Sequence, residues 1–292
     1  MPVVIAVFGP TASGKTAVAE TIADRFGTDV VSCDALQVYR GLPILTNQPT
    51  RPTALVAIRG LSEEMSVGAY APLAHEAIDQ RILTTGTAVV SGGTGLYLRA
   101  ALAEMGMPAP PGAGVREGIL AEVEADPVAA HDRLEHLDPR AAAAVHVNDA
   151  RRLIRALELA ETGQSLVPDD DRLWASVTRH PTLIAGLDVP ADELERRIVA
   201  RTDEMFAQGV VAEVRAALAA GVSATAAKAL GLTEIATLPE AEARERIVIR
   251  TRRYAAYQRK WMRRIPGLVS VDGTRSPEEV ADAILEVARA RQ

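Results

Sequence analysis

The chain has 292 residues, of which 48% are hydrophobic and 24% charged, so its composition is that of a globular protein and excludes a disordered chain. No apolar run approaches the ~20 residues that a membrane-spanning helix needs, which excludes a transmembrane protein. The net charge of −6 argues against a uniformly basic nucleic-acid-binding protein. The only cysteine, Cys33, excludes an intramolecular disulfide and fits a reducing, cytoplasmic location. The five scattered histidines form no recognisable metal-ligand set.

The first predicted element is a buried strand over Val3–Phe8, a continuous apolar run without the basic start or cleavage site of a signal peptide. It is followed by a glycine-rich turn and by a helical pattern over Lys15–Phe26. The turn matches G-x-x-x-x-G-K-[ST] at every fixed position and lies between a strand and a helix, as a phosphate-binding P-loop requires. Its residues are Gly9, Pro10, Thr11, Ala12, Ser13, Gly14, Lys15 and Thr16.

This loop predicts a diphosphate- or triphosphate-binding site. Its glycines allow successive N–H groups to point into one concavity, at the positive end of the following helix. Lys15, one of three lysines against 29 arginines, adds a compact cation, and the Thr16 hydroxyl is a candidate ligand for Mg²⁺. The loop alone does not indicate phosphoryl transfer.

A second strand is predicted over Asp29–Ser32, and the first acidic residue after it is Asp34. Asp34 is the only carboxylate at a strand end near the loop, because the third strand, Ala88–Ser91, runs directly into Gly92-Gly93. From position alone, Asp34 is a candidate to hold magnesium, to bind a second substrate, to act as a base or merely to cap a turn.

Strands and helices alternate along the chain, which predicts an α/β fold. A helical stretch around Tyr70–Leu83 separates the second and third strands, and later strands are expected at Leu183–Val189 and Leu268–Val271. We therefore expect a P-loop NTPase-like parallel sheet flanked by helices. Further helices are predicted over Ala191–Ala220, Glu240–Arg264 and Pro277–Ala290.

A segment rich in proline and glycine, Met105–Gly114, interrupts this alternation. The chain that follows is helical to about Gly163, and Asp126-Pro127 and Asp138-Pro139 each supply an N-cap followed by proline. We therefore predict a helical insertion domain over residues 111–164. The α/β core would then consist of residues 1–110 and 165–292.

The positive charge of the chain is concentrated in one segment. The segment Arg244–Arg264 contains nine Arg and Lys residues and a single acidic residue, Glu245, so its net charge is +8. Such a segment in an acidic protein indicates either a contact surface for a polyanion or a solvated helix.

Several blocks together resemble the tRNA dimethylallyltransferase (isopentenyltransferase) family. The phosphate loop is followed by D-A-L-Q-V-Y at 34–39, G-G-T-G-L-Y at 92–97 and H-V-N-D-A-R-R-L-I-R at 146–155. Further matches are Arg201, Glu213, the block at 229–235 and the spaced residues Tyr254, Gln258 and Trp261. The blocks occur in the family's order over residues 1 to about 272.

The resemblance implies transfer of the dimethylallyl group of dimethylallyl diphosphate to N6 of adenosine 37 in tRNA, with Mg²⁺ as cofactor and diphosphate released. It implies that Asp34 is the base, that Thr94 lies beside the reacting atoms and that Arg201 supports the leaving diphosphate. The residues that it places on tRNA are Asp34, Ala35, Leu36, Gln37, Thr94, Arg116, Arg151, Arg152, Arg155 and Gly231. Tyr39, Tyr254 and Trp261 are candidates either to stack on bases or to lie in the core, and for Trp261 we favour the core. We expect a monomer with no membrane contact.

Three alternatives remain open from the sequence. They are a cytokinin-type transferase that prenylates AMP, a small-molecule kinase that uses Asp34 as its base, and an inactive, nucleic-acid-binding relative. The stretch Leu45–Pro49 departs from the family's usual G-T-A-K-P, since Gln48 stands where the family has lysine. The basic segment and the arginines at 151–155 favour tRNA over AMP.

Overall fold

A computed structural model describes residues 3–106, 114–167, 173 and 175–290. They form two compact units, residues 1–105 with 173–292 and residues 106–172. The predicted insertion over 111–164 lies inside the second unit. Most of the proline- and glycine-rich stretch between Met105 and Gly114 lies outside the described residues. Among those described, no helix is long and apolar enough to cross a bilayer.

The first unit contains a six-stranded sheet in the order β3-β2-β4-β1-β5-β6. The strands are β1 (Val4–Phe8), β2 (Val30–Ser32), β3 (Thr53–Ala54), β4 (Ala88–Gly92), β5 (Thr182–Asp188) and β6 (Val269–Asp272). Every neighbouring pair is parallel, which confirms the predicted α/β parallel sheet. The two-residue strand β3 was not predicted, because two partly buried residues show no periodicity.

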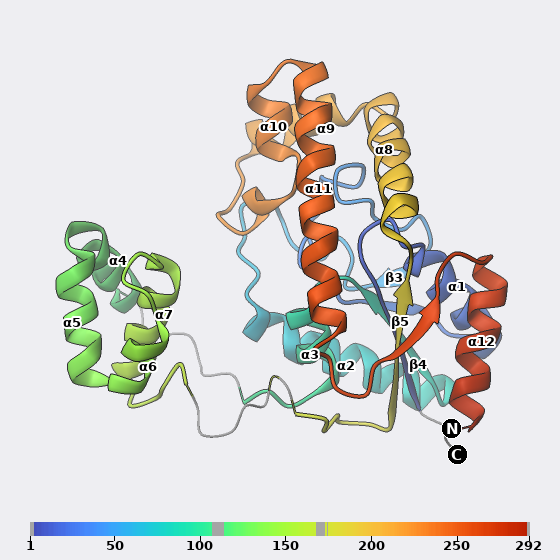
Figure 1. The fold of residues 1–292 in the computed structure, drawn as a ribbon, viewed down its shortest axis with the longest axis horizontal. Coiled ribbons are helices and arrows are strands. Elements are labelled where there is room, and N and C mark those ends of the chain that lie inside the picture. Colours follow the sequence, from blue (N-terminus) through green and yellow to red (C-terminus); the bar gives the residue numbers. More distant parts are fainter. Residues whose placement is uncertain (1–2, 107–113, 168–172, 174, 291–292) are drawn as a thin grey trace. The chain divides into compact units, whose positions relative to one another are not determined.

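Helices flank the sheet (Figure 1). The helices of this unit are α1 (Lys15–Phe26), α2 (Val67–Thr85), α3 (Gly95–Leu102), α8 (Ala191–Ala207), α9 (Val210–Ala220), the 3-10 turn η1 (Ala226–Lys228), α10 (Leu232–Thr237), α11 (Glu240–Met262) and α12 (Pro277–Ala290). Helices α1 and α12 bury Ile22 and Ile284 against the central strands. Helices α8 to α11 form a second core around Phe206 and Val214, and α11 runs beside α8 (Figure 1).

The parallel register brings three loops to one edge of the sheet. Phe8 of β1 lies opposite Gly92 of β4, and Ser32 of β2 lies opposite Ser91. The segments that follow these strands are the phosphate loop, the Asp34 turn and the Gly93-Thr94 turn. Since carboxyl ends of parallel strands form the usual ligand crevice of such sheets, the candidate site lies there.

The second unit is a small helical bundle with its own core. It contains α4 (Val115–Ala125), α5 (Pro127–Leu137), α6 (Pro139–Ala144) and α7 (Ala150–Ala160). Asp126 and Asp138 accept hydrogen bonds from the first N–H groups of α5 and α6, as predicted. Leu134, Leu153 and Leu157 are fully buried at the centre of the bundle.

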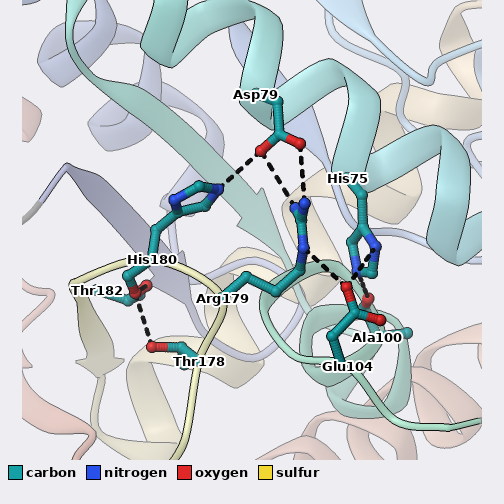
Figure 2. Close-up of polar contacts among 8 residues, drawn as sticks. All are labelled: His75, Asp79, Ala100, Glu104, Thr178, Arg179, His180 and Thr182. Carbon is teal, nitrogen blue, oxygen red and sulfur yellow. Dashed lines mark hydrogen bonds and ion pairs between the residues drawn. The ribbon is translucent and has the colours of Figure 1, made fainter.

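The two chain segments that connect the units are fixed to α2 by a polar cluster (Figure 2). Asp79 of α2 accepts hydrogen bonds from both terminal nitrogens of Arg179 (2.8 and 3.2 Å) and pairs with His180 (2.7 Å). Arg179 also binds Glu104 through Nε (3.0 Å), and its backbone N–H donates to Leu102 O (2.8 Å). The outgoing and returning segments therefore lie side by side where they meet the first unit.

Candidate active site

The phosphate loop has the backbone conformation that its sequence predicts. Gly14 has φ +87°, in the left-handed region that favours glycine, and α1 begins at the next residue. The buried Ser13 hydroxyl has no hydrogen-bond partner among the described residues. The Lys15 ammonium lies 3.5 Å from Pro10 O, and burial lowers its pKa to about 8 despite the opposing effect of Asp34. A diphosphate in this loop would place a further anion beside the Lys15 ammonium.

Two side chains from distant parts of the sequence hold Thr11 at the tip of the loop. Arg201 of α8 donates from Nη1 to Thr11 Oγ1 (2.8 Å), and Gln258 of α11 accepts from the Thr11 backbone N–H (2.7 Å). Burial lowers the pKa of Arg201, whereas Asp34 raises it. Arg201 makes no surface ion pair with any described residue, and its guanidinium lies at the loop where the leaving diphosphate is expected.

Asp34 uses its two carboxylate oxygens differently. Oδ1 accepts from the backbone N–H groups of Leu36 (2.9 Å) and Gln37 (3.4 Å), which is the turn-capping role considered from the sequence. Within the described part of the chain, Oδ2 accepts no hydrogen bond. Oδ2 is therefore able to accept a proton or a hydrogen bond from a substrate.

Thr94 adjoins Asp34 across the sheet edge. Its Oγ1 lies 3.5 Å from the Ala35 backbone N and 3.5 Å from the hydroxyl of Tyr254, a residue of α11. Burial and the nearby charge of Asp34 raise the pKa of Tyr254 to about 12, so this phenol stays protonated and can donate a hydrogen bond. The structure thus brings Asp34, Thr94 and Tyr254 together.

Helix α11 packs so closely against the turn around Thr94 that only glycine fits immediately before and after Thr94. A Cβ on Gly93 would lie 2.2 Å from the Gln258 amide, and one on Gly95 would lie 2.2 Å from the Trp261 ring. Gln258 is 2% exposed and donates to Gly93 O (2.9 Å) while it accepts from Thr11. Gln258 therefore joins the phosphate loop to the turn that carries Thr94. From the sequence, Gln258 stands out only as part of a family block, because its two partners are more than 160 residues away.

The stretch Leu45–Pro49, which departs from the family pattern, is held in place by hydrogen bonds. Gln48 donates to Gln37 O (3.1 Å) and Tyr39 O (2.7 Å), so this neutral amide braces the loop after Asp34. Glu213 of α9 accepts from the backbone N–H groups of Ile44 and Leu45 (2.8 Å each). Gln48, which stands where the family has lysine, therefore hydrogen-bonds to the loop that follows Asp34.

Gly231 and Tyr39 have structural roles in the first unit. Gly231 has φ +102°, and a Cβ there would lie 2.9 Å from Leu45. Tyr39 is 1% exposed and bonds to Thr225, so the expectation that it stacks on a base is wrong. Trp261 is partly buried against Gly95, in keeping with a core role.

The four candidate tRNA-binding arginines of the insertion all lie in the second unit. Arg116 and Arg155 both pair with the fully buried carboxylate of Glu158 (2.6 and 3.0 Å). Arg151 and Arg152, in the first turn of α7, are exposed and pair with no carboxylate among residues 114–167. Of these four arginines, Arg151 and Arg152 are therefore the two that form no ion pair within the described part of the unit.

The basic segment is less positive than its sequence suggests. Five of its arginines form ion pairs, with carboxylates on α8, α10, α11 and β5. They are Arg244, Arg246, Arg250, Arg252 and Arg259. These five paired arginines therefore contribute less to a polyanion-binding surface than the sequence suggests.

A small cavity beside the phosphate loop has the donors that suit a hard cation. Its lining includes Thr16, Glu20, Ser32 and Asp34, whose oxygen atoms are of the type that Mg²⁺ prefers. The ammonium of Lys15 also lines this cavity. No group of three His, Cys, Asp or Glu side chains able to hold a metal occurs among the described residues. The oxygen donors that line this cavity therefore fit a magnesium ion, which would need further ligands from outside this set.

Comparisons with known proteins agree with the resemblance found in the sequence. The IPP transferase family model matches residues 37–265, and the isopentenyl transferase model matches residues 2–59. The tRNA dimethylallyltransferase of Salinispora arenicola is 37% identical over 98% of this chain and 87% of its own. That of Mycolicibacterium smegmatis is also 37% identical, over 98% of both chains.

Two solved structures share the fold. The tRNA isopentenylpyrophosphate transferase of Bacillus halodurans has a TM-score of 0.70 and 29% identity, over 99% of this chain and 96% of its own. A eukaryotic dimethylallyltransferase described as acting on tRNA has a TM-score of 0.82 at 24% identity, over 99% and 78% of the two chains. The predicted P-loop-like fold is thus confirmed by its neighbours.

Proposed function

The chain belongs to the IPP transferase family, and on this premise we propose that it transfers a dimethylallyl group from dimethylallyl diphosphate to N6 of adenosine 37 in tRNA. The observation that carries the proposal is that Asp34 shares one cavity with Lys15 and Thr16 of the phosphate loop. A hydrogen-bond acceptor for an amine thus lies beside the site for a leaving diphosphate. That arrangement suits an alkyl transfer.

In the proposed reaction, the adenosine N6 attacks C1 of the dimethylallyl group, a C–N bond forms and the C–O bond to diphosphate breaks. Asp34 Oδ2 accepts the proton that N6 loses, and Thr94 and Tyr254 orient the amine. Lys15, Arg201 and the loop N–H groups stabilise the negative charge that develops on the diphosphate. Thr16 would hold Mg²⁺, which when bound would neutralise part of the diphosphate charge.

We extend the proposal to the acceptor. Arg151 and Arg152 bind phosphates of the anticodon stem-loop, and Ala35, Leu36 and Gln37 adjoin the target base, which must leave its stack to reach Asp34. AMP has no stem-loop phosphates for these arginines. The exposed Arg151 and Arg152 therefore favour tRNA over AMP as acceptor. We also propose that the enzyme acts as a monomer in the cytoplasm.

The test is transfer of labelled dimethylallyl groups with Mg²⁺ to two acceptors in parallel, unmodified tRNA with adenosines at positions 36 and 37, and AMP. We expect label in tRNA alone. Label in AMP alone would establish the cytokinin-type activity instead. Label in neither acceptor would leave a diphosphate-binding protein without this activity.

A further inference from the structure

Helix α3 joins the candidate active site to the segment that leaves for the second unit. The carbonyl of Thr94, beside Asp34, accepts from the Leu98 N–H (2.9 Å), which forms the first turn of the helix. After eight residues α3 ends at Leu102, and the first unit is interrupted at Met105. A helix of this length spans about 12 Å. One short, rigid element thus connects Thr94 with the outgoing segment.

The side chain of Arg99 holds the returning segment to the same helix. Arg99 is 0% exposed and is the largest fully buried side chain among the described residues. It donates from Nε to Leu173 O (2.8 Å) and from Nη2 to Ala175 O (2.7 Å), contacts that we call the Arg99 anchor. Burying a guanidinium costs free energy unless protein acceptors replace its water. These two carbonyls do so, and they belong to the segment that re-enters the first unit at Leu173.

A second anchor lies four residues further along the returning segment. The Arg179 N–H donates to Leu102 O at the end of α3 (2.8 Å), and its guanidinium binds Asp79 and Glu104 (Figure 2). Between the Arg99 anchor and this Arg179 anchor, Val177 is exposed. The returning segment is therefore fixed at two places, with an exposed stretch between them.

The Arg99 anchor determines the length of chain that tethers the second unit. Six residue steps separate Val167, the last described residue of that unit, from Leu173. Without the Arg99 contacts the next fixed point would be Arg179, which is twelve steps from Val167. The r.m.s. span of an unanchored chain grows with the square root of its length, so doubling the steps raises it about 1.4-fold.

We propose that Arg99 is a positioning residue that limits how far the insertion can move from Asp34 and Thr94. This inference rests on the function proposed above, in which Arg151 and Arg152 bind the stem-loop whose target base meets Asp34. An RNA that contacts both units gains affinity from their effective concentration, which falls as roughly the −3/2 power of the tether length. Doubling the tether therefore weakens RNA binding about threefold.

The experiment first measures the anchor itself, in the full-length protein without RNA. Spin labels on Leu83→Cys and Leu137→Cys, two exposed positions in different units, report the distance distribution between the units by double electron–electron resonance. The native Cys33 is buried, and burial raises the pKa of its thiol, so it stays unlabelled. Binding of an anticodon stem-loop RNA is then measured by fluorescence anisotropy.

Three changes distinguish the Arg99 anchor from the Arg179 anchor. Arg99→Met removes the donors and keeps a long side chain. An insertion of about six Gly/Ser residues after Val167 lengthens the tether while the anchor stays intact. The matched control is the same insertion after Val177, between the two anchors, where the Arg99 contacts keep the tether unchanged. Both insertions retain Arg99, so they test the inference even if Arg99→Met does not fold, which thermal denaturation checks.

We expect Arg99→Met and the insertion after Val167 each to widen the distance distribution by up to about 1.4-fold and to weaken RNA binding about threefold. The insertion after Val177 should alter neither quantity in the presence of Arg99, but should widen the distribution further when combined with Arg99→Met. Equal widening by the two insertions would overturn the inference, because Arg179 would then be the effective anchor. Unaltered distances in a folded Arg99→Met variant would overturn it as well.

Dimethylallyl transfer to tRNA by the wild type separates this inference from the proposed function. Transfer combined with distances that do not depend on Arg99 would reject the anchor and leave the function in place. The expected distance changes, together with no transfer by the wild type, would support the anchor and reject the function.

Discussion

Asp34 combines a structural and a chemical role in one side chain. Oδ1 caps the turn that leads to Gln37, whereas Oδ2 faces no protein donor within the described part of the chain. Replacement by alanine would disturb the turn as well as the chemistry. Replacement by asparagine keeps an oxygen for the turn and removes the anion.

For Asp34→Asn we expect kcat to fall by about 10²- to 10⁴-fold, because proton acceptance in the transition state is lost. Binding of tRNA and of dimethylallyl diphosphate should change by less than about threefold. Single-turnover label transfer and equilibrium binding measure the two effects. A variant that retained wild-type kcat would remove Asp34 from the mechanism.

The lowered pKa of Lys15 predicts how the affinity for dimethylallyl diphosphate depends on pH. Its pKa is lowered to about 8 by burial, so in the free protein the ammonium loses its proton as the pH rises through about 8. The neutral amine binds diphosphate less well. The affinity for dimethylallyl diphosphate should therefore fall by up to about tenfold per pH unit above 8.

Isothermal titration calorimetry between pH 7 and 9.5 tests this expectation. In the Lys15→Arg control the guanidinium stays charged throughout, so a weaker but pH-independent affinity is expected. A flat profile for the wild type would show that Lys15 does not set the charge of the loop.

At the scale of elements, α11 is the helix that aligns the two halves of the site. Its residue Gln258 holds Thr11 of the phosphate loop with one amide atom and Gly93 with the other. The donor site and the acceptor site therefore share one rigid connection. Loss of that connection would allow the reacting groups to move apart.

We expect Gln258→Leu to lower kcat roughly 10- to 100-fold, because a displacement of about 1 Å between reacting groups has effects of that size. The KM for tRNA should change much less. The Gln258→Glu control can still accept from Thr11 but cannot donate to Gly93 when ionised, so its activity should recover as the pH falls. A uniform loss in both variants at every pH, in step with their melting temperatures, would indicate a purely structural role.

The elements with clear local signals were predicted well. Lys15–Phe26 and Pro277–Ala290 match α1 and α12 at both ends, because a glycine loop and a proline fix their starts. Helix α3 and strand β3 were not predicted. Helix α3 follows two glycines and owes its position to packing against α2 and α11, which is information that no local window contains.

The parts of the candidate site that are encoded in short sequence motifs could be predicted. The phosphate loop, Asp34 and Thr94 come together as the strand order requires, and Arg201 reaches Thr11. The pairing of charges was not predictable, since Arg250 and Arg252 meet Glu234 and Glu195 from other helices.

At the scale of the whole molecule, the chain combines two units with separate hydrophobic cores. One core lies between the sheet and helices α1 and α12, and another surrounds Leu134 within residues 106–172. The residues expected to bind the donor belong to the first unit. Arg151 and Arg152, expected to grip the RNA stem, belong to the second.

The polar cluster around Asp79 indicates that the second unit could be removed without disturbing the first. Leu102 and Arg179, which lie near the two points where the chain leaves and re-enters the first unit, share a backbone hydrogen bond of 2.8 Å. Replacing residues 106–172 by a flexible Gly/Ser linker of about six residues should therefore leave a folded protein. It should bind dimethylallyl diphosphate like the full chain and lose prenylation of tRNA, as calorimetry and label transfer would show.

If the shortened chain failed to fold, the two units would depend on each other. If it folds, the insertion is a replaceable module. Bundles with other surfaces could then be grafted between the same two anchor points, redirecting one prenylation chemistry to new nucleic acids. A fold of this kind allows acceptor choice to evolve, or to be engineered, without altering the chemistry at Asp34.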